Sequence, residues 1–197
     1  MDQTRLERLQ KMMAGEDLAA LVCRLSENVV YLTDYWPHHG FSVAVLPREG
    51  RPLALVPEVE QEYAEQSWAE VTPFGWGLLK DGDMYVSFRK WLQELVQKLG
   101  LKGKKIGVEK SFEITGPTYR AAEPVVPAGP WHSLLEDVFA ESELVDANDL
   151  LSTAKAIKGE YELEKMRIAN EIAEMGIRYA LGKLEPGMTE AQVGALI

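Results

Sequence analysis

The sequence predicts an α/β fold, in which a mixed β-sheet is flanked by helices and followed by a long junction helix. Short aliphatic runs alternate with helical patterns along most of the chain. The run LAALVC at residues 18–23 has no polar position, which is typical of a strand covered on both faces. The runs at residues 41–46 and 53–56 are joined by a short loop with proline and glycine, which indicates an antiparallel hairpin within the alternating order.

The first elements alternate around this hairpin. Thr4-Arg5-Leu6-Glu7 has the form of a capping box and predicts a helix that ends at Gly15. We expect a short helix over residues 26–32 between the first strand and the hairpin. A short helix over residues 58–66 and a strand over residues 70–74 follow.

Residues 83–99 form the clearest helix of this half, because their apolar positions make one broad face and Gly100 ends the pattern. A strand over residues 105–108 comes next. The later expected elements are a helix over residues 115–122, an extended segment over 124–127, a helix begun by a capping box at Ser133 and ending near Ala140, a strand over 143–145, and a helix over 147–157 capped by Asp146.

A long helix is predicted over residues 158–184, and its wide apolar stripe requires a large partner surface. Pro186-Gly187 marks a turn, and Thr189-Glu190-Ala191-Gln192 is a capping box that begins another helix. The apolar stripe of that helix has no continuation. We therefore expect a fragment, with one N-terminal domain over residues 1–150, and a junction helix and the first elements of a second domain over residues 151–197.

The composition is that of an ordinary globular protein, with 46% hydrophobic and 26% charged residues. The formal net charge of −10 argues against a nucleic-acid partner, which requires a basic face. The single cysteine, Cys23, lies in an apolar run, so we expect a buried thiol and a reducing, cytoplasmic compartment. No apolar run reaches transmembrane length and no signal peptide is recognised, so no membrane partner is expected.

The residues themselves predict no catalytic machinery and no metal site. The sequence has no HExxH, CxxC or Gly-x-Ser-x-Gly motif, and His38 and His39 are adjacent, which makes them a poor chelate. Gly75-Trp76-Gly77 lacks the lysine of a phosphate loop and is interpreted as a turn, and His132 is interpreted as structural.

An aromatic loop is the exception, since Tyr35, Trp36, His38 and His39 follow one another closely. Two interpretations stay open. Tyr35 and Trp36 plug the sheet edge, or the loop is a recognition segment, for which aromatic and imidazole side chains supply rigid contact area with a polar end.

Three motifs then follow one another along the chain. The first comprises Arg8, the strand over residues 18–22 and ENVVYLT at residues 27–33. The second is KAIKGEYE at residues 155–162, and the third is LEPGMTE at residues 184–190. In this order they resemble the creatinase, prolidase and aminopeptidase P family.

Three residues depart from the family's pattern, and one of them is Tyr161, which lies between Glu160 and Glu162 in the second motif. Asp34 stands where glycine is usual, so another backbone path is expected there, and Lys155 stands where arginine is usual.

The resemblance implies a ribonuclease-H-like N-terminal domain joined to a C-terminal pita-bread catalytic domain of a metal-dependent Xaa-Pro dipeptidase or aminopeptidase. The substrate would be a short proline-containing peptide. Family members bind two divalent ions (Mn, Co or Zn) through two Asp, one His and two Glu, which activate a hydroxide. These ligands lie beyond the junction helix, so no residue of this chain is expected to be catalytic and the chain should be inactive alone.

The resemblance also implies a homodimer in which the N-terminal domain reaches the active site of the partner subunit and restricts substrate length. Tyr35, Trp36, His38 and His39 are then the residues expected near substrate in trans. Two alternatives stay open: the same domain of a creatinase-like amidinohydrolase, and a non-enzymatic peptide-binding relative. The downstream ligand set would distinguish them.

Overall fold

The computed structural model describes residues 3–39, 41–75, 82–110 and 129–196. The chain divides into two compact units, Gln3–Ala156 and Ile157–Ile197. The helix expected over residues 115–122, the extended segment over 124–127, and Trp76 and Gly77 lie outside the described residues.

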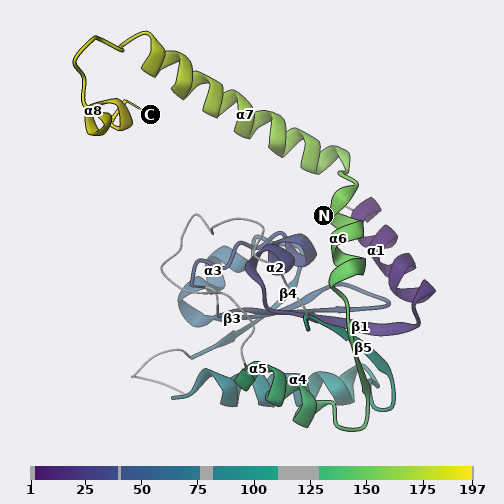
Figure 1. Ribbon diagram of the computed structural model, residues 1–197. Helices are drawn as coiled ribbons and strands as arrows, with labels where there is room; N and C mark the ends of the chain where they lie inside the picture. The colour runs from purple at the N-terminus through teal and green to yellow at the C-terminus, as the bar shows by residue number, and fades with distance from the viewer. Residues whose placement is uncertain (1–2, 40, 76–81, 111–128, 197) are drawn as a thin grey trace. The chain divides into compact units, whose positions relative to one another are not determined.

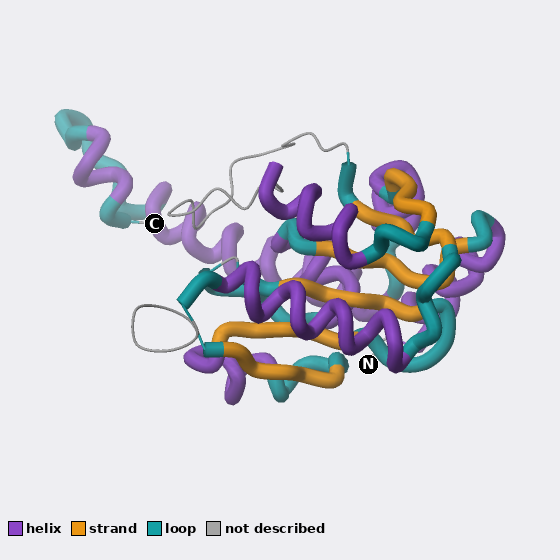
Figure 2. The backbone as a smooth tube through the Cα atoms, turned by 90° about the horizontal axis from the view of Figure 1, so that it is seen from below, coloured by secondary structure: helices purple, strands orange, loops and turns teal. Residues whose placement is uncertain are grey.

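The first unit contains a six-stranded mixed sheet, which confirms the predicted fold class (Figure 1). Its strands are β1 (Leu18–Cys23), β2 (Val43–Pro47), β3 (Leu53–Pro57), β4 (Glu70–Phe74), β5 (Lys105–Val108) and β6 (Glu143–Asp146). The spatial order is β4-β3-β2-β1-β5-β6, and Figure 2 shows the strands side by side in one layer. β2 pairs antiparallel with β1 and β3, as the predicted hairpin requires, whereas β1–β5, β5–β6 and β3–β4 are parallel pairs.

Helices cover both faces of the sheet. The helices α4 (Met84–Lys98) and α5 (Gly129–Val138) pack on one face, and α1 (Gln3–Gly15), α2 (Ser26–Thr33) and α6 (Asn148–Ala156) on the other (Figure 1). β1 alternates between two cores, because Ala20 and Val22 join the α4/α5 core while Leu21 and Cys23 join the opposite one. Cys23 is therefore a buried free thiol, as predicted.

Two of the four predicted helix N-caps are wrong, and both were predicted as capping boxes. α1 already begins at Gln3, whose side chain donates to Glu7 at 2.9 Å one turn later, so Thr4 lies inside the helix. α5 begins at Gly129 with Pro130 in its first turn, a favoured position for proline, so Ser133 also lies inside a helix.

The other two predicted caps are confirmed. Asp146 Oδ1 accepts from the backbone N–H of Asn148 at 3.2 Å at the start of α6. Thr189 Oγ1 accepts from the backbone N–H of Gln192 at 3.3 Å, and the Gln192 side chain accepts from the N–H of Thr189 at 2.9 Å.

The second unit contains α7 (Glu160–Leu181) and α8 (Glu190–Gly194). α7 is shorter than predicted because it begins after Gly159, whose N–H donates to Glu162 at 2.9 Å. Its large apolar side chains are exposed: Met166, Ile168, Ile172, Met175, Ile177 and Tyr179. None of the helices that the structure describes has both the length and the hydropathy needed to span a membrane.

Candidate functional site

The aromatic loop at residues 35–39, for which a sheet-edge plug and a recognition segment are the two open interpretations, lies against a buried glutamate, Glu60. β3 ends at Pro57 and the chain turns at once through a single 3-10 turn, η1 (Glu58–Glu60), into the short helix α3 (Gln61–Ala64). This turn directs Glu60 inward, where the residue is only 4% exposed. A carboxylate in such a place is costly unless donors surround it.

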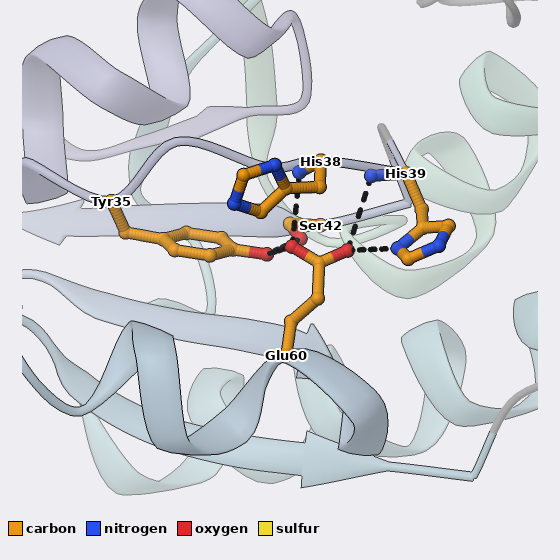
Figure 3. Close-up of polar contacts among 5 residues, drawn as sticks. All are labelled: Tyr35, His38, His39, Ser42 and Glu60. Atoms are coloured by element: carbon orange, nitrogen blue, oxygen red, sulfur yellow. Dashed lines mark hydrogen bonds and ion pairs between the residues drawn. The ribbon is translucent and has the colours of Figure 1, made fainter.

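Four donor groups surround this carboxylate (Figure 3). One oxygen, Oε2, accepts from the hydroxyl of Tyr35 and from the backbone N–H of His38 at 2.9 Å. The other, Oε1, accepts from the backbone N–H of His39 at 3.1 Å and contacts its imidazole Nδ1. The hydroxyl of Tyr35 also lies 3.1 Å from Oγ of Ser42. We call these five residues the Glu60 cluster.

The cluster favours a charged carboxylate at neutral pH. Burial disfavours ionisation of Glu60, but the hydrogen bonds from Tyr35, His38 and His39 outweigh it and hold the pKa of Glu60 below its usual range. Burial and the hydrogen bond to Glu60 raise the pKa of the Tyr35 hydroxyl. The hydroxyl therefore stays protonated and acts as the donor in its hydrogen bond to Glu60.

The structure gives the four predicted site residues different places. Tyr35 is 1% exposed and acts as an internal anchor, as the plug interpretation expects, whereas Trp36 is 44% exposed. His38 is exposed, and its ring stacks at a tilt on Tyr63 of α3 with the centroids 4.8 Å apart. His39 is half-buried beside Glu60. The segment thus has a fixed backbone that presents one indole and one imidazole to its surroundings.

Sequence reasoning missed Glu60 and a second buried glutamate, Glu109. β1 and β5 are parallel neighbours, so the residues after them meet at one edge of the sheet. There Glu109 accepts from the backbone N–H of Arg24 at 2.8 Å and of Leu25 at 3.1 Å, and from Asn28 Nδ2 at 2.7 Å. Asn28 Oδ1 in turn accepts from Lys155 Nζ at 2.7 Å. An acidic residue directly after an apolar strand was the available signal for Glu109, which follows the last residue of β5. The same signal would have marked the exposed Glu58 after β3 and not Glu60, which comes two residues later.

The motif residues of the first and second motifs therefore meet in space and hold the fold together. Arg8 donates to the hydroxyl of Tyr31 at 3.3 Å and to the carbonyl of Ala154 at 3.1 Å, which ties α1 to α2 and α6. Lys155, despite replacing the usual arginine, reaches Asn28 of α2. These contacts give both motifs a structural role.

Asp34 stands where glycine is usual in the family's pattern, and its backbone has a conformation that glycine adopts readily. It ends α2 with φ of 62°, in the left-handed region that glycine adopts most readily, and its N–H bonds to the carbonyl of Val30 at 2.8 Å. Asp tolerates this conformation better than most residues. The replacement thus changes the side chain and leaves a glycine-like C-cap.

The described residues do not fit a metal centre. No group of three or more His, Cys, Asp or Glu is gathered in the described ranges. His132 lies half-buried within α5.

Comparison with known proteins gives a consistent assignment. Residues 5–157 match the model of the creatinase/prolidase N-terminal domain. The chain is 24% identical, over 96% of its length and 47% of the relative's, to an uncharacterised peptidase of Staphylococcus saprophyticus. It is similar in fold to the prolidase of Pyrococcus horikoshii (TM-score 0.67, 21% identity, 98% of this chain and 46% of that one). It is also similar to the X-Pro aminopeptidase of Thermotoga maritima (TM-score 0.72, 20% identity, 97% and 47%). The chain thus spans about half the length of these proteins.

Proposed function

Because the chain belongs to the creatinase/prolidase N-terminal domain family, we propose that it is the substrate-gating domain of a metal-dependent Xaa-Pro dipeptidase or aminopeptidase. The proposal is supported by the relatives, whose other half has no counterpart in this chain. The divalent ions and their ligands would belong to that C-terminal catalytic domain. This chain's own contribution is then to shape the entrance to the active site.

The observation that supports gating best is that residues 35–39 combine an anchored backbone with exposed aromatic and imidazole side chains. The Glu60 cluster fixes the backbone of His38 and His39, while Trp36 and His38 remain exposed. Sites built on fixed backbone and rigid aromatic side chains discriminate by shape, because little conformational entropy is lost when they meet a ligand. A mobile surface loop would not need a buried carboxylate beneath it.

The segment would act across a homodimer. In this arrangement Trp36 and His38 of one subunit narrow the substrate pocket of the other, so that short proline-containing peptides enter and longer ones are excluded. Steric exclusion of this kind changes the ratio of kcat/KM values between substrates, since it discriminates against one substrate and leaves the catalytic groups in place.

The test compares Trp36→Ala with wild type in the full-length protein. The substrates are a Xaa-Pro dipeptide and a pentapeptide that begins with the same two residues. We expect the kcat/KM of the pentapeptide to rise roughly tenfold relative to that of the dipeptide. Val86→Ala, on the exposed side of α4, is the control and should leave the ratio unchanged.

Two results would contradict the proposal. An unchanged ratio in Trp36→Ala, together with a lowered melting temperature, would mean that the indole only plugs the sheet edge. Failure of the metal-loaded wild-type protein to hydrolyse any Xaa-Pro peptide would rule out the peptidase assignment itself.

A further inference from the structure

Glu60 holds the segment Tyr35–His39 at both of its ends. Oε2 accepts a hydrogen bond from the hydroxyl of Tyr35, at the start of the segment, and from the backbone N–H of His38, near its end. One oxygen atom therefore binds both ends of the loop. Oε1 takes the N–H and contacts the ring of His39. The exposed Trp36 lies between these anchored positions in the chain.

We propose that Glu60 is a positioning residue for substrate selection, because its carboxylate sets where the side chains of Trp36 and His38 stand and therefore which peptide length the gate admits. This inference rests on the proposed gating function. It assigns a specificity role to a residue that has little exposed surface and need not touch substrate.

The donor set requires a carboxylate at this position. An ionised carboxylate has two oxygens that only accept, and the cluster uses both of them. Since the carboxylate has no proton to donate, the hydrogen of the contact with His39 must reside on its Nδ1. Glutamine has the same shape but only one accepting oxygen, so its amide group would face at least one pair of donors.

The short helix α3 also contacts the segment Tyr35–His39, through the ring of Tyr63. Tyr63 follows Glu60 by three residues, and its ring lies 4.8 Å from that of His38 and 5.9 Å from that of Tyr35. Two residues close together in the chain therefore restrain the His38 imidazole, Glu60 through the backbone and Tyr63 through the ring. A shift of the turn that contains Glu60 and Tyr63 would therefore move the whole segment Tyr35–His39.

Glu60→Gln in the full-length protein tests the inference, and Glu109→Gln is the matched control. Both variants remove the charge of a buried glutamate that binds backbone N–H groups, but Glu109 lies at the opposite end of α2 from the segment. The first readout is amide hydrogen exchange at His38 and His39. The second is the ratio of kcat/KM values for the dipeptide and the pentapeptide.

In Glu60→Gln we expect exchange at both amides to be at least about tenfold faster and the ratio to shift by roughly tenfold, because a small displacement of a positioned group has effects of this size. Glu109→Gln should leave the ratio unchanged, and because it lowers the stability of the whole unit, it should speed exchange no more at His38 and His39 than at the other amides of that unit. Equal shifts in both variants would overturn the inference, since loss of stability alone would then explain them. Unchanged exchange in Glu60→Gln would also overturn it.

Two further comparisons separate this inference from the proposed function. If Glu60→Gln speeds amide exchange but leaves the ratio of kcat/KM values unchanged, the proposed role of Glu60 is overturned. Trp36→Ala then decides the gating function. A shifted ratio in Trp36→Ala means that gating stands, and an unchanged ratio means that gating fails as well. Should Glu60→Gln not fold, Tyr35→Phe removes one donor and keeps the ring. It should shift exchange and ratio in the same direction by a smaller factor, and no shift would overturn the inference.

Discussion

Replacement of Glu109 by glutamine is expected to destabilise the first unit strongly. The carboxylate is fully buried and receives two backbone N–H groups and the amide of Asn28. Glutamine can accept at one oxygen only, so at least one of these hydrogen bonds is lost. The NH2 group of the glutamine then faces an N–H group that donated to the carboxylate. A hydrogen bond to a charged group contributes about 1.5–3 kcal/mol, and an unsatisfied buried donor costs about 1–3 kcal/mol more.

Relief from burying a charge offsets part of this loss. We therefore expect the free energy of unfolding to fall by about 2–4 kcal/mol at pH 7. The melting temperature should fall by roughly 5–15 °C in a chain of this size. Urea unfolding followed by tryptophan fluorescence is the assay, because the first unit contains the buried Trp91 and Trp131.

The pH dependence of this difference tests the electrostatic reasoning. Burial raises the pKa of Glu109 above its usual value against the opposing hydrogen bonds from Asn28, Arg24 and Leu25. A raised folded-state pKa means that the folded protein takes up the proton first, so wild type gains stability over Glu109→Gln as the pH falls toward the unfolded pKa. Only this pH-dependent part of the advantage is lost as the pH rises through the folded pKa, and the difference of about 2–4 kcal/mol expected at pH 7 is the part that remains. A free-energy difference that shrinks on acidification, or a variant as stable as wild type at pH 7, would refute the reasoning.

Two other substitutions test local features of the fold. Asp34 has a left-handed backbone, which glycine adopts readily and valine does not. Asp34→Gly should therefore keep or raise the free energy of unfolding, while Asp34→Val should lower it by about 1–2 kcal/mol. Equal stabilities of the two variants in urea unfolding would contradict the C-cap assignment. A methyl group at Gly107 would lie 2.6 Å from Leu21 Cδ2 and 3.0 Å from the Cβ of Ala147. Gly107→Ala should therefore cost about 1–3 kcal/mol, whereas Gly15→Ala, which meets nothing within 4 Å, should not be destabilising in the same assay.

The sequence predicted most of the fold because local patterns and tertiary packing agree here. The strands at residues 18–23, 70–74 and 105–108 were predicted with their observed bounds. For residues 18–23 the reason is that an apolar run that ends in polar residues leaves little freedom. Helix starts were less certain. Thr4 and Ser133 match a capping pattern, but the pair Gln3–Glu7 and the proline at position 130 begin those helices earlier.

The candidate site was predicted only in part, for a physical reason. A cluster of aromatic and histidine residues is visible in the sequence, and it marked residues 35–39. Glu60 lies more than twenty residues away in the chain, and an exposed and a buried glutamate are identical in a sequence. Only the turn after β3 shows that Glu60 faces inward, and only the pairing of β1 with β5 brings Glu109 to Arg24.

Mixed dimers of the full-length protein test most directly whether the segment Tyr35–His39 gates the partner subunit. One subunit is inactivated in its catalytic domain, so each dimer has a single working active site, and Trp36→Ala is introduced into one subunit or the other. The account predicts an altered ratio of kcat/KM values between the dipeptide and the pentapeptide only when the substitution is in the inactive subunit. An altered ratio only when Trp36→Ala is in the active subunit, or a protein that works as a monomer, would contradict it.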